Sequence, residues 1–365
     1  MPIRDNTISI VIPTRNRPQS LAKTLDSFST INDQYANLEI IIVDNSSSTQ
    51  TCQTIASNFK NKYLHKASVR FFADQTPGLL SGRHRGLKEA NGDIIAYIDD
   101  DVIFTPQWIE GIIECFTDPK VALCGGPTTP LFFSPPPPWL ESFWCKRDSL
   151  LSYLPELSLT RIPFPCVLEV EPNYIFGLNF AIRREILLEA GGFHPDCVPP
   201  ELQHFQGDGE TGLSQKLHEL GYRSTYHYKV HLLHQIESSR LTIEYFENRY
   251  FYQGVCDSYS DVRKNGGRCP NPPQVAPITK SSLPARALRR IKRTLLPTAK
   301  PPHYDESSCV KRQCIAAYQR GYDFHQECVR RSPKLREWIS KANYFDYRYP
   351  QLEREFEPPQ RKPTS

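Results

Sequence analysis

Three consecutive aspartates, Asp99, Asp100 and Asp101, directly follow the apolar run 94–98, whose length and β-branched residues predict a buried strand. Carboxylates this close together repel one another, and a divalent cation would offset that cost because hard cations bind carboxylate and phosphate oxygens. The carboxyl ends of strands are also where open α/β sheets bind ligands. A solvated acidic turn is the alternative for the triplet alone, but its position after a strand favours a metal and phosphate site.

A second acidic segment, Gly207-Asp208-Gly209-Glu210, precedes a helical pattern at 211–220. Glycines let a ligand approach closely, and a carboxylate is favourable at a helix N-terminus. Helix capping would explain this composition. The functional interpretation is a general base that takes a proton from a hydroxyl nucleophile.

Basic and polar residues follow the other predicted strands. Thr14-Arg15-Asn16-Arg17 follows the strand 8–12, Asp44 ends the strand 39–43, and residues 81–85 open a helix before the triplet. Arginines and helix N-termini bind diphosphates, and an aspartate at a strand end can hold a ribose or a base. Each residue alone fits an ordinary surface position, whereas together they predict one nucleotide pocket. The glycine motifs of P-loop NTPases and Rossmann dehydrogenases are absent after the first strand.

The elements that must position these residues alternate regularly. Apolar strands at 8–12, 39–43, 94–98 and 121–124 are separated by helical patterns, including 18–28, 79–90 and 106–116. Continuous apolar strands between helices indicate a mostly parallel sheet covered on both faces. We therefore predict an α/β fold with a doubly wound, three-layer sheet. A mainly helical C-terminal extension follows it.

Composition narrows the function classes. The net charge is +4, but residues 261–300 alone carry 10 Lys/Arg against one acidic residue, so the rest of the chain is negative. That distribution and the lack of a recognised module argue against nucleic-acid binding. Eleven cysteines without a CxxC pair indicate reduced thiols. No apolar run approaches the roughly 20 residues that span a bilayer, and no signal peptide is apparent, so we expect a cytoplasmic protein.

Six ordered blocks resemble family 2 glycosyltransferases with the GT-A fold. The resemblance covers roughly residues 7–255. The blocks are Val11–Arg17, Ile42–Ser46, Gly78–Arg83, Tyr97–Val102, Phe176–Arg184 and Gly191–Phe193. Such enzymes transfer a sugar from a nucleotide-diphospho-sugar, here predicted to be UDP-linked, to an acceptor hydroxyl with inversion.

The resemblance implies a role for each matching position at the donor end. Arg83 would lie on the diphosphate side, and Asp101, with Asp99 and His234, would hold Mn²⁺ or Mg²⁺. A core or surface position would explain His234 equally well. The residues predicted to line the nucleotide are Pro13, Thr14, Arg15, Asp44, Arg83, Asp99 and Asp100.

At the acceptor end, the family's catalytic pair, usually Glu-Asp, aligns with Gly209-Glu210. Glu210 therefore takes the position of the base while the preceding acid is missing, and Asp208 either substitutes for that acid or is itself the base. The residues predicted to bind the acceptor, a glycan or a lipid-linked sugar, are Asn179, Trp139 and Trp144. Ordinary packing is the alternative for both tryptophans.

The 32 prolines help to divide the chain. We predict a catalytic domain over 1–260, with a nucleotide-binding half (1–125), a flap (127–165) and an acceptor half (166–260). A basic, Pro-rich linker (261–302) and a helical extension (303–365) follow. A basic helical pattern at 285–296 would suit peripheral contact with the inner face of a membrane, or packing on its own domain.

Two other functions fit parts of this pattern. A sugar-nucleotide pyrophosphorylase also holds a nucleotide and a metal on an α/β sheet, but residues 9–17 contain neither the Gly nor the Lys expected of its nucleotide loop. A non-catalytic nucleotide-sugar-binding protein is the second alternative, against which the intact aspartate triplet argues.

Overall fold

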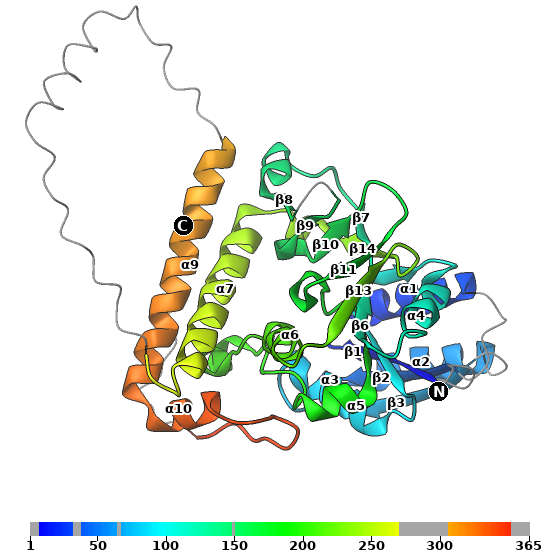
Figure 1. Cartoon of the computed structure of the whole chain (residues 1–365), viewed down its shortest axis with the longest axis horizontal. Coiled ribbons are helices and arrows are strands. Elements are labelled where there is room, and N and C mark those ends of the chain that lie inside the picture. The colour runs from blue at the N-terminus through cyan, green and yellow to red at the C-terminus, as the bar shows by residue number, and fades with distance from the viewer. Residues whose placement is uncertain (1–6, 32–37, 64–66, 148–149, 270–305, 352–365) are drawn as a thin grey trace, which may run out of the picture.

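The computed structural model describes residues 7–31, 38–63, 67–147, 150–269 and 306–351 (Figure 1). The basic segment 285–296 lies outside the described residues, so the membrane contact predicted for it is not addressed. Within the described residues, no helix is both long and apolar enough to cross a membrane.

An eight-stranded sheet forms the centre of the molecule, with strand order β11-β13-β6-β12-β4-β1-β2-β3. The pairs β3–β2, β2–β1, β1–β4 and β6–β13 are parallel, and β12 runs antiparallel between β4 and β6. The strands are β1 (Ile8–Thr14), β2 (Leu38–Asp44), β3 (Ala67–Ala73), β4 (Ile94–Ile98), β6 (Val121–Gly125), β11 (Val167–Val170), β12 (Asn179–Arg183) and β13 (Arg223–His227).

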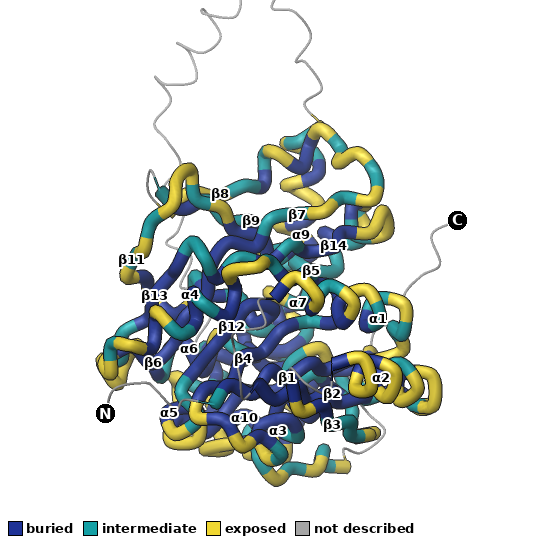
Figure 2. The backbone as a smooth tube through the Cα atoms, turned by 90° about the vertical axis from the view of Figure 1, so that its right-hand side faces the viewer, coloured by how far each residue is buried: buried dark blue, intermediate teal, exposed yellow. Residues whose placement is uncertain are grey.

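Helices cover both faces of this sheet, and its central strands are almost wholly buried, whereas the edge strands β3 and β11 are partly exposed (Figure 2). In β4, Ile94, Ala96 and Ile98 pack with one hydrophobic core, and Ile95 and Tyr97 with another. The first core includes residues of α1 (Pro18–Ser27), α2 (Gln50–Lys62) and α4 (Trp108–Cys115). The second includes residues of α3 (Leu79–Glu89), α5 (Arg184–Glu189) and α6 (Glu210–Glu219). The predicted three-layer α/β fold is confirmed.

A second, six-stranded sheet was not predicted. Its order is β5-β14-β7-β10-β9-β8, and all its pairs except β14–β7 are antiparallel. The strands are β5 (Val102–Phe104), β7 (Thr128–Phe132), β8 (Cys145–Lys146), β9 (Ser152–Leu154), β10 (Leu159–Arg161) and β14 (Leu232–Ile236). Most are too short to show a periodic pattern, so the segment 127–165 reads as irregular from sequence alone. The 3₁₀ turn η3 (Pro155–Leu157) connects β9 to β10.

Two long helices, α7 (Ile243–Lys264) and α9 (Glu306–Arg331), lie side by side along one flank of the molecule, and α10 (Pro333–Ile339) follows (Figure 1). Glycines allow α7 and α9 to approach closely. A Cβ at Gly321 would lie 2.0 Å from the carbonyl oxygen of Phe251, and one at Gly254 2.1 Å from that of Tyr318. The two helices therefore pack backbone to backbone. The helix α7 is thus held in place by α9, which is not part of either sheet.

Gly321→Ala is therefore expected to destabilise the protein, although alanine normally favours a helix by about 1 kcal/mol over glycine. The added methyl would meet backbone rather than a flexible side chain, and such overpacking costs about 1–3 kcal/mol. Urea denaturation measures the change. Arg312→Ala, on an exposed part of α9, is the control and should change stability by less than about 0.5 kcal/mol. Equal or higher stability of Gly321→Ala would contradict the close packing.

Candidate active site

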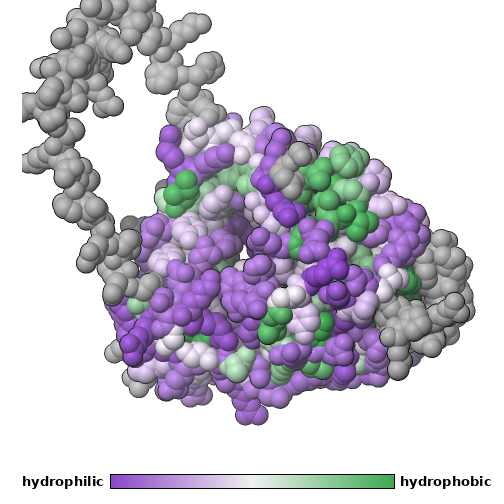
Figure 3. Space-filling view, in the orientation of Figure 1, coloured by the Kyte–Doolittle hydropathy of each residue, from purple (hydrophilic) through white to green (hydrophobic). Residues whose placement is uncertain are grey.

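A cavity of about 560 Å³ lies at the carboxyl ends of β1 and β4. The second sheet, the turn η3 and one side of α7 complete its walls, and a hollow is visible on the largely hydrophilic face drawn in Figure 3. Its lining includes Pro13, Thr14, Arg15, Arg17, Asn45, Asp99, Asp100, Glu156, Asp196, Gln206, Asp208, Glu210, His234, Arg240, Tyr245, Arg249 and Tyr252. Most residues predicted at the strand ends therefore meet in one cavity.

The aspartate triplet is held by residues from distant elements. Thr14 Oγ1 donates to Asp100 Oδ2 at 2.6 Å, and Arg17 pairs with both Asp100 and Asp101 at 2.7 Å. Arg240, after β14, approaches Asp101 Oδ2 at 2.8 Å. Burial raises the pKa of Asp100 to about 7 although Arg17 opposes the shift, and burial together with Asp101 raises that of Asp99. Clustered negative charge is costly here, as the sequence predicted.

His234 lies against this cluster and fits a cation-binding role. Its Nδ1–H donates to Leu157 O at 2.9 Å, and Arg240 donates to its Nε2 at 2.9 Å, so Nε2 carries a lone pair. That nitrogen is 3.4 Å from Asp101 Oδ1, an oxygen with no hydrogen-bond partner among the described residues. Two electron pairs facing each other at this distance suit a cation between or beside them.

The protein alone does not assemble a full ligand shell. No group of three or more His, Cys, Asp or Glu side chains in the described part of the chain is placed to hold a metal ion. Instead, Arg17 and Arg240 form ion pairs with the Asp101 carboxylate. The donor set therefore fits a cation that takes its remaining ligands from bound phosphate oxygens, as Mg²⁺ commonly does.

The nucleotide end is shaped by Asp44 and the turn that follows β1. Asn16 adopts φ 56°, and its N–H donates to Ser46 Oγ at 2.7 Å, while Ser46 in turn donates to Asp44 Oδ1. Asp44 is fully buried and does not line the cavity, and no nitrogen or oxygen donor in the described structure reaches its Oδ2. The Cys52 thiol interacts with the Asp44 carboxylate, but a thiol is a weak donor, so a buried oxygen with no stronger partner beside a cavity fits a bound ligand better than a purely structural role.

Glu210 occupies the first turn of α6 and faces the cavity with 27% of its side chain exposed. Arg83 pairs with its Oε2 at 3.0 Å, and Gly177 N–H donates to Oε1 at 3.2 Å. Burial acts to raise the pKa of Glu210, but Arg83 and Gly177 hold it below its usual range. The buried Arg83 was predicted to lie on the diphosphate side, but in the structure it forms an ion pair with Glu210.

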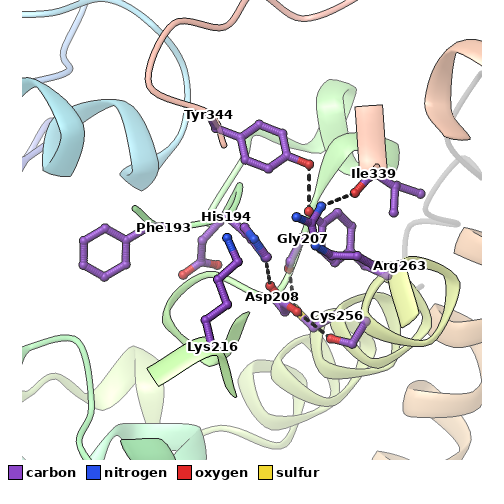
Figure 4. Close-up of polar contacts among 12 residues, drawn as sticks. Phe193, His194, Gly207, Asp208, Lys216, Cys256, Arg263, Ile339 and Tyr344 are labelled. Atoms are coloured by element: carbon purple, nitrogen blue, oxygen red, sulfur yellow. Dashed lines mark hydrogen bonds and ion pairs between the residues drawn. The ribbon is translucent and has the colours of Figure 1, made fainter. Parts of the chain in front are cut away.

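Asp208 is buried, and its side-chain partners come from two segments of the chain (Figure 4). His194 Nδ1 lies 2.6 Å from its Oδ1, and Ser260 on α7 donates to its Oδ2 at 2.6 Å. Cys256, also on α7, donates to the neighbouring Gly207 O. Burial acts to raise the pKa of Asp208, but the bonds from His194 and Ser260 hold it below its usual value. Asp208 therefore connects the residues that precede α6 to the helix α7, and we call this structural role a buttress.

The three predicted acceptor residues do not line the cavity. Asn179 uses both ends of its amide internally, with bonds to Trp108, Val230 and Gly126. Trp139 is 4% exposed and packs edge-on against Phe246. An indole so buried cannot stack on a sugar in this structure, so the acceptor role does not fit Trp139. Trp144 is covered by the guanidinium of Arg161, 4.0 Å from its ring.

Sequence reasoning missed several cavity residues. Arg17 stood within a motif that was noticed, and Asp196 follows the Gly191–Phe193 block by three positions. Tyr245, Arg249 and Tyr252 recur at helical spacing on α7, a signal that also fits ordinary packing. Only the fold places that helix against the cavity.

Comparisons with known proteins agree with this arrangement. Residues 9–171 match the model of glycosyl transferase family 2. A glucosyl-dolichyl phosphate glucuronosyltransferase of Haloferax volcanii is 23% identical over 265 residues, which cover 70% of this chain and 77% of that protein. A dolichol-phosphate mannosyltransferase of Pyrococcus furiosus is 35% identical over 109 residues, 29% of each chain.

A solved structure has the same fold. It is the mannosyltransferase PcManGT from Pyrobaculum calidifontis in complex with GDP-Man and Mn²⁺. The match has a TM-score of 0.54 at 16% identity and covers 89% of this chain and 88% of that one.

Asp208→Asn is expected to lower the free energy of unfolding by about 2–3 kcal/mol at pH 7, because two bonds to a buried charge are weakened. Urea denaturation measures the loss. Ser260→Ala removes one of these bonds and should cost about half as much. Unchanged stability of Asp208→Asn would show that the carboxylate is not a buttress.

Proposed function

We propose that this chain, which matches the model of glycosyl transferase family 2 over residues 9–171, is a glycosyltransferase whose cavity binds a nucleotide-diphospho-sugar and transfers the sugar, with inversion, to an acceptor hydroxyl. The observation that carries the proposal is the meeting of three groups in one cavity. These are the turn after β1, the aspartates Asp99 and Asp100 with His234, and the carboxylates near the start of α6, while the buried Asp101 lies against His234. Glycan or glycolipid biosynthesis is the setting that the relatives support.

The donor nucleotide would occupy the side of the cavity formed by the carboxyl ends of β1, β2 and β4. Pro13, Thr14 and Arg15 line that side, and the unpaired oxygen of Asp44 lies behind it. A carboxylate there suits the N–H of a base or the hydroxyls of a ribose. We keep UDP as the predicted nucleotide. The similar PcManGT structure contains GDP-Man, so guanosine donors belong in the same test.

The diphosphate would lie near Asp99, Asp101 and His234, which are the residues that would hold Mn²⁺ or Mg²⁺. Such an ion neutralises the charge that develops on a departing diphosphate. Arg17 and Arg240, which pair with Asp101 in this structure, are long enough to turn toward phosphate oxygens instead. The cation would then balance the charge of the aspartates, and the two arginines would balance that of the diphosphate.

The acceptor would enter between η3, α7 and the start of α6. The carboxylates that face this end are Glu210, the base that the family resemblance suggests, Asp196, and Glu156 on η3, whereas Asp208 has both oxygens engaged. Direct attack by the hydroxyl on the anomeric carbon, opposite the diphosphate, would invert the configuration. A glycan or a lipid-linked sugar is the proposed acceptor class, since the relatives' names include dolichyl phosphates.

We also keep the division of the chain as a proposal, with a catalytic domain over 1–260 and two C-terminal segments. The helix α7, whose residues line the cavity, extends past residue 260 to Lys264. A lipid-linked acceptor would bring the enzyme to a membrane surface. The cytoplasmic location with peripheral contact therefore stays a prediction.

A panel of UDP- and GDP-sugars with Mn²⁺ tests the function by release of nucleoside diphosphate. We expect release from one donor, and EDTA should reduce it by at least about 100-fold because the leaving charge is no longer neutralised. Release of pyrophosphate from a nucleoside triphosphate and a sugar phosphate would indicate a pyrophosphorylase. Tight donor binding without turnover, whichever acceptor is added, would indicate a binding protein.

Asp101→Asn should lower transfer at least about 100-fold and remove the Mn²⁺ dependence of nucleoside diphosphate binding, as measured by calorimetry. The reason is that Asp101 carries the charge paired with Arg17, Arg240 and the proposed cation. Asp118→Asn, on the far side of the sheet from the cavity and paired with Arg223, is the matched control. Mn²⁺-dependent binding retained by Asp101→Asn would exclude Asp101 as a ligand.

A further inference from the structure

The catalytic pair of the family lacks its first acid here, because Gly209 stands where that acid is expected. Gly209 has φ +53°, a conformation that side-chain-bearing residues rarely adopt. A Cβ built on it would lie 2.7 Å from Oδ2 of Asp196 and 2.9 Å from its Cγ. The Asp196 carboxylate thus occupies the space that a side chain at 209 would need.

The loop around Asp196 fixes this position. Cys197 adopts φ 48°, and its N–H donates to Asp196 Oδ1 at 2.7 Å. Gln206 Nε2 donates to the same oxygen at 2.8 Å. The main-chain oxygen of Asp196 accepts from Leu79 N–H at the start of α3. One carboxylate oxygen is therefore anchored on both sides.

The other oxygen, Oδ2, makes no hydrogen bond or ion pair within the described residues, and Asp196 lines the cavity. In Glu210, by contrast, Arg83 binds one oxygen and Gly177 N–H the other. Asp196 and Glu156 on η3 are thus the lining carboxylates of this end with an oxygen that has no hydrogen-bond partner among the described residues, and of the two it is Asp196 that fills the space beside Gly209.

The charges that face Asp196 come from three helices. Glu210 on α6 opposes its ionisation, while Arg83 on α3 and Arg249 on α7 favour it, and the thiols of Cys197 and Cys256 complete the surroundings. Burial, followed by Glu210, raises the pKa of Asp196 above its usual value. A base is most effective when its pKa lies near the working pH, so this shift favours Asp196 over Glu210.

We propose that Asp196 supplies the carboxylate missing from position 209 and is the general base of the transfer, with Glu210 as the residue that positions Arg83. This inference rests on the proposed glycosyl transfer. It assigns a base from a loop outside the 210–219 helix.

In this step the acceptor oxygen forms a bond to the anomeric carbon as the bond from that carbon to the diphosphate oxygen breaks. The electron pair of the broken bond leaves with the nucleoside diphosphate. The acceptor proton passes to Oδ2 of Asp196, which then loses it to solvent. The products are the glycoside, the nucleoside diphosphate and one proton.

The test compares Asp196→Asn with wild type, using the donor that the panel identifies. Asparagine keeps an acceptor for Cys197 N–H and Gln206 but cannot take the proton. We expect kcat to fall at least about 100-fold while the Kd for nucleoside diphosphate with Mn²⁺ changes less than about threefold. Asp257→Asn is the matched control, since this half-buried aspartate does not line the cavity and accepts bonds from Gln253 and Tyr318.

The pH dependence separates Asp196 from Glu210. For wild type, kcat/KM should fall on the acid side as the base becomes protonated. The residual activity of Asp196→Asn should lack that limb, whereas Glu210→Gln should be slower yet retain it. Loss of the limb in Glu210→Gln alone would give the proton to Glu210 and overturn the proposal.

Stability gives a readout that does not need turnover. The pKa of Asp196 is raised in the fold, so wild type loses stability as pH rises through that pKa, and Asp196→Asn should not. Its Tm relative to wild type should therefore increase between pH 4 and pH 8 by at least about 2 °C. Glu210→Gln should show little change over that range, because the pKa of Glu210 is lowered in the fold and wild type loses the corresponding stability only as pH falls below the ordinary glutamate value.

The outcomes distinguish the two levels of the proposal. If wild type releases nucleoside diphosphate and Asp196→Asn matches it in kcat, the role of Asp196 is refuted and glycosyl transfer stands. A flat Tm difference would likewise show an ordinary solvated aspartate. If wild type releases no nucleoside diphosphate from any donor, the proposed function fails and the role of Asp196 with it.

Discussion

The structure depends on the containment of negative charge at one edge of a buried sheet. Asp100 and Asp101 are almost fully buried, and Glu210 and Asp208 lie at the other side of the same cavity. Asp100, Asp101 and Glu210 are paired with arginines that the chain brings from far away in sequence, and Asp208 bonds a histidine 14 positions away. Arg17 and Arg240 reach the triplet from opposite ends of the domain, Arg83 reaches Glu210 across 127 positions, and His194 bonds Asp208. Removing a partner would leave a buried charge unpaired, which is costly.

This constraint explains why the cavity needs both sheets. The eight-stranded sheet supplies the carboxyl ends of β1 and β4, and the second sheet carries His234 on β14 next to Asp101. The strand β5 begins directly after the triplet and pairs with β14, so the aspartates lie at the junction of the two sheets. The arginines that pair with Asp101 at that junction, or a cation bound in their place, would link the two sheets electrostatically.

The C-terminal helices contribute side chains to the other end of the cavity, where we propose that the acceptor binds. The helix α7 contributes Arg249 and two tyrosines to the cavity, and Ser260 on the same helix bonds the buttress Asp208. Its close packing on α9 through Gly254 and Gly321 holds it against the sheet. Residues well beyond the family match at 9–171 thereby complete the cavity, at the end where we propose that the acceptor binds.

The sequence by itself determined the doubly wound sheet and the side of the cavity formed by the strand ends, which we propose binds the donor. Continuous apolar strands have a local signature, and ligand residues that directly follow parallel strands must meet at one edge. The acceptor side was decided only by tertiary structure. Asn179, Trp139 and Trp144 pack inward, and Asp196 and the α7 residues line the cavity in their place. The second sheet, built from very short strands, and the backbone contact of α7 with α9 depend on pairings between distant segments. Such pairings leave no periodic trace, so no local pattern could show which side chains face the acceptor.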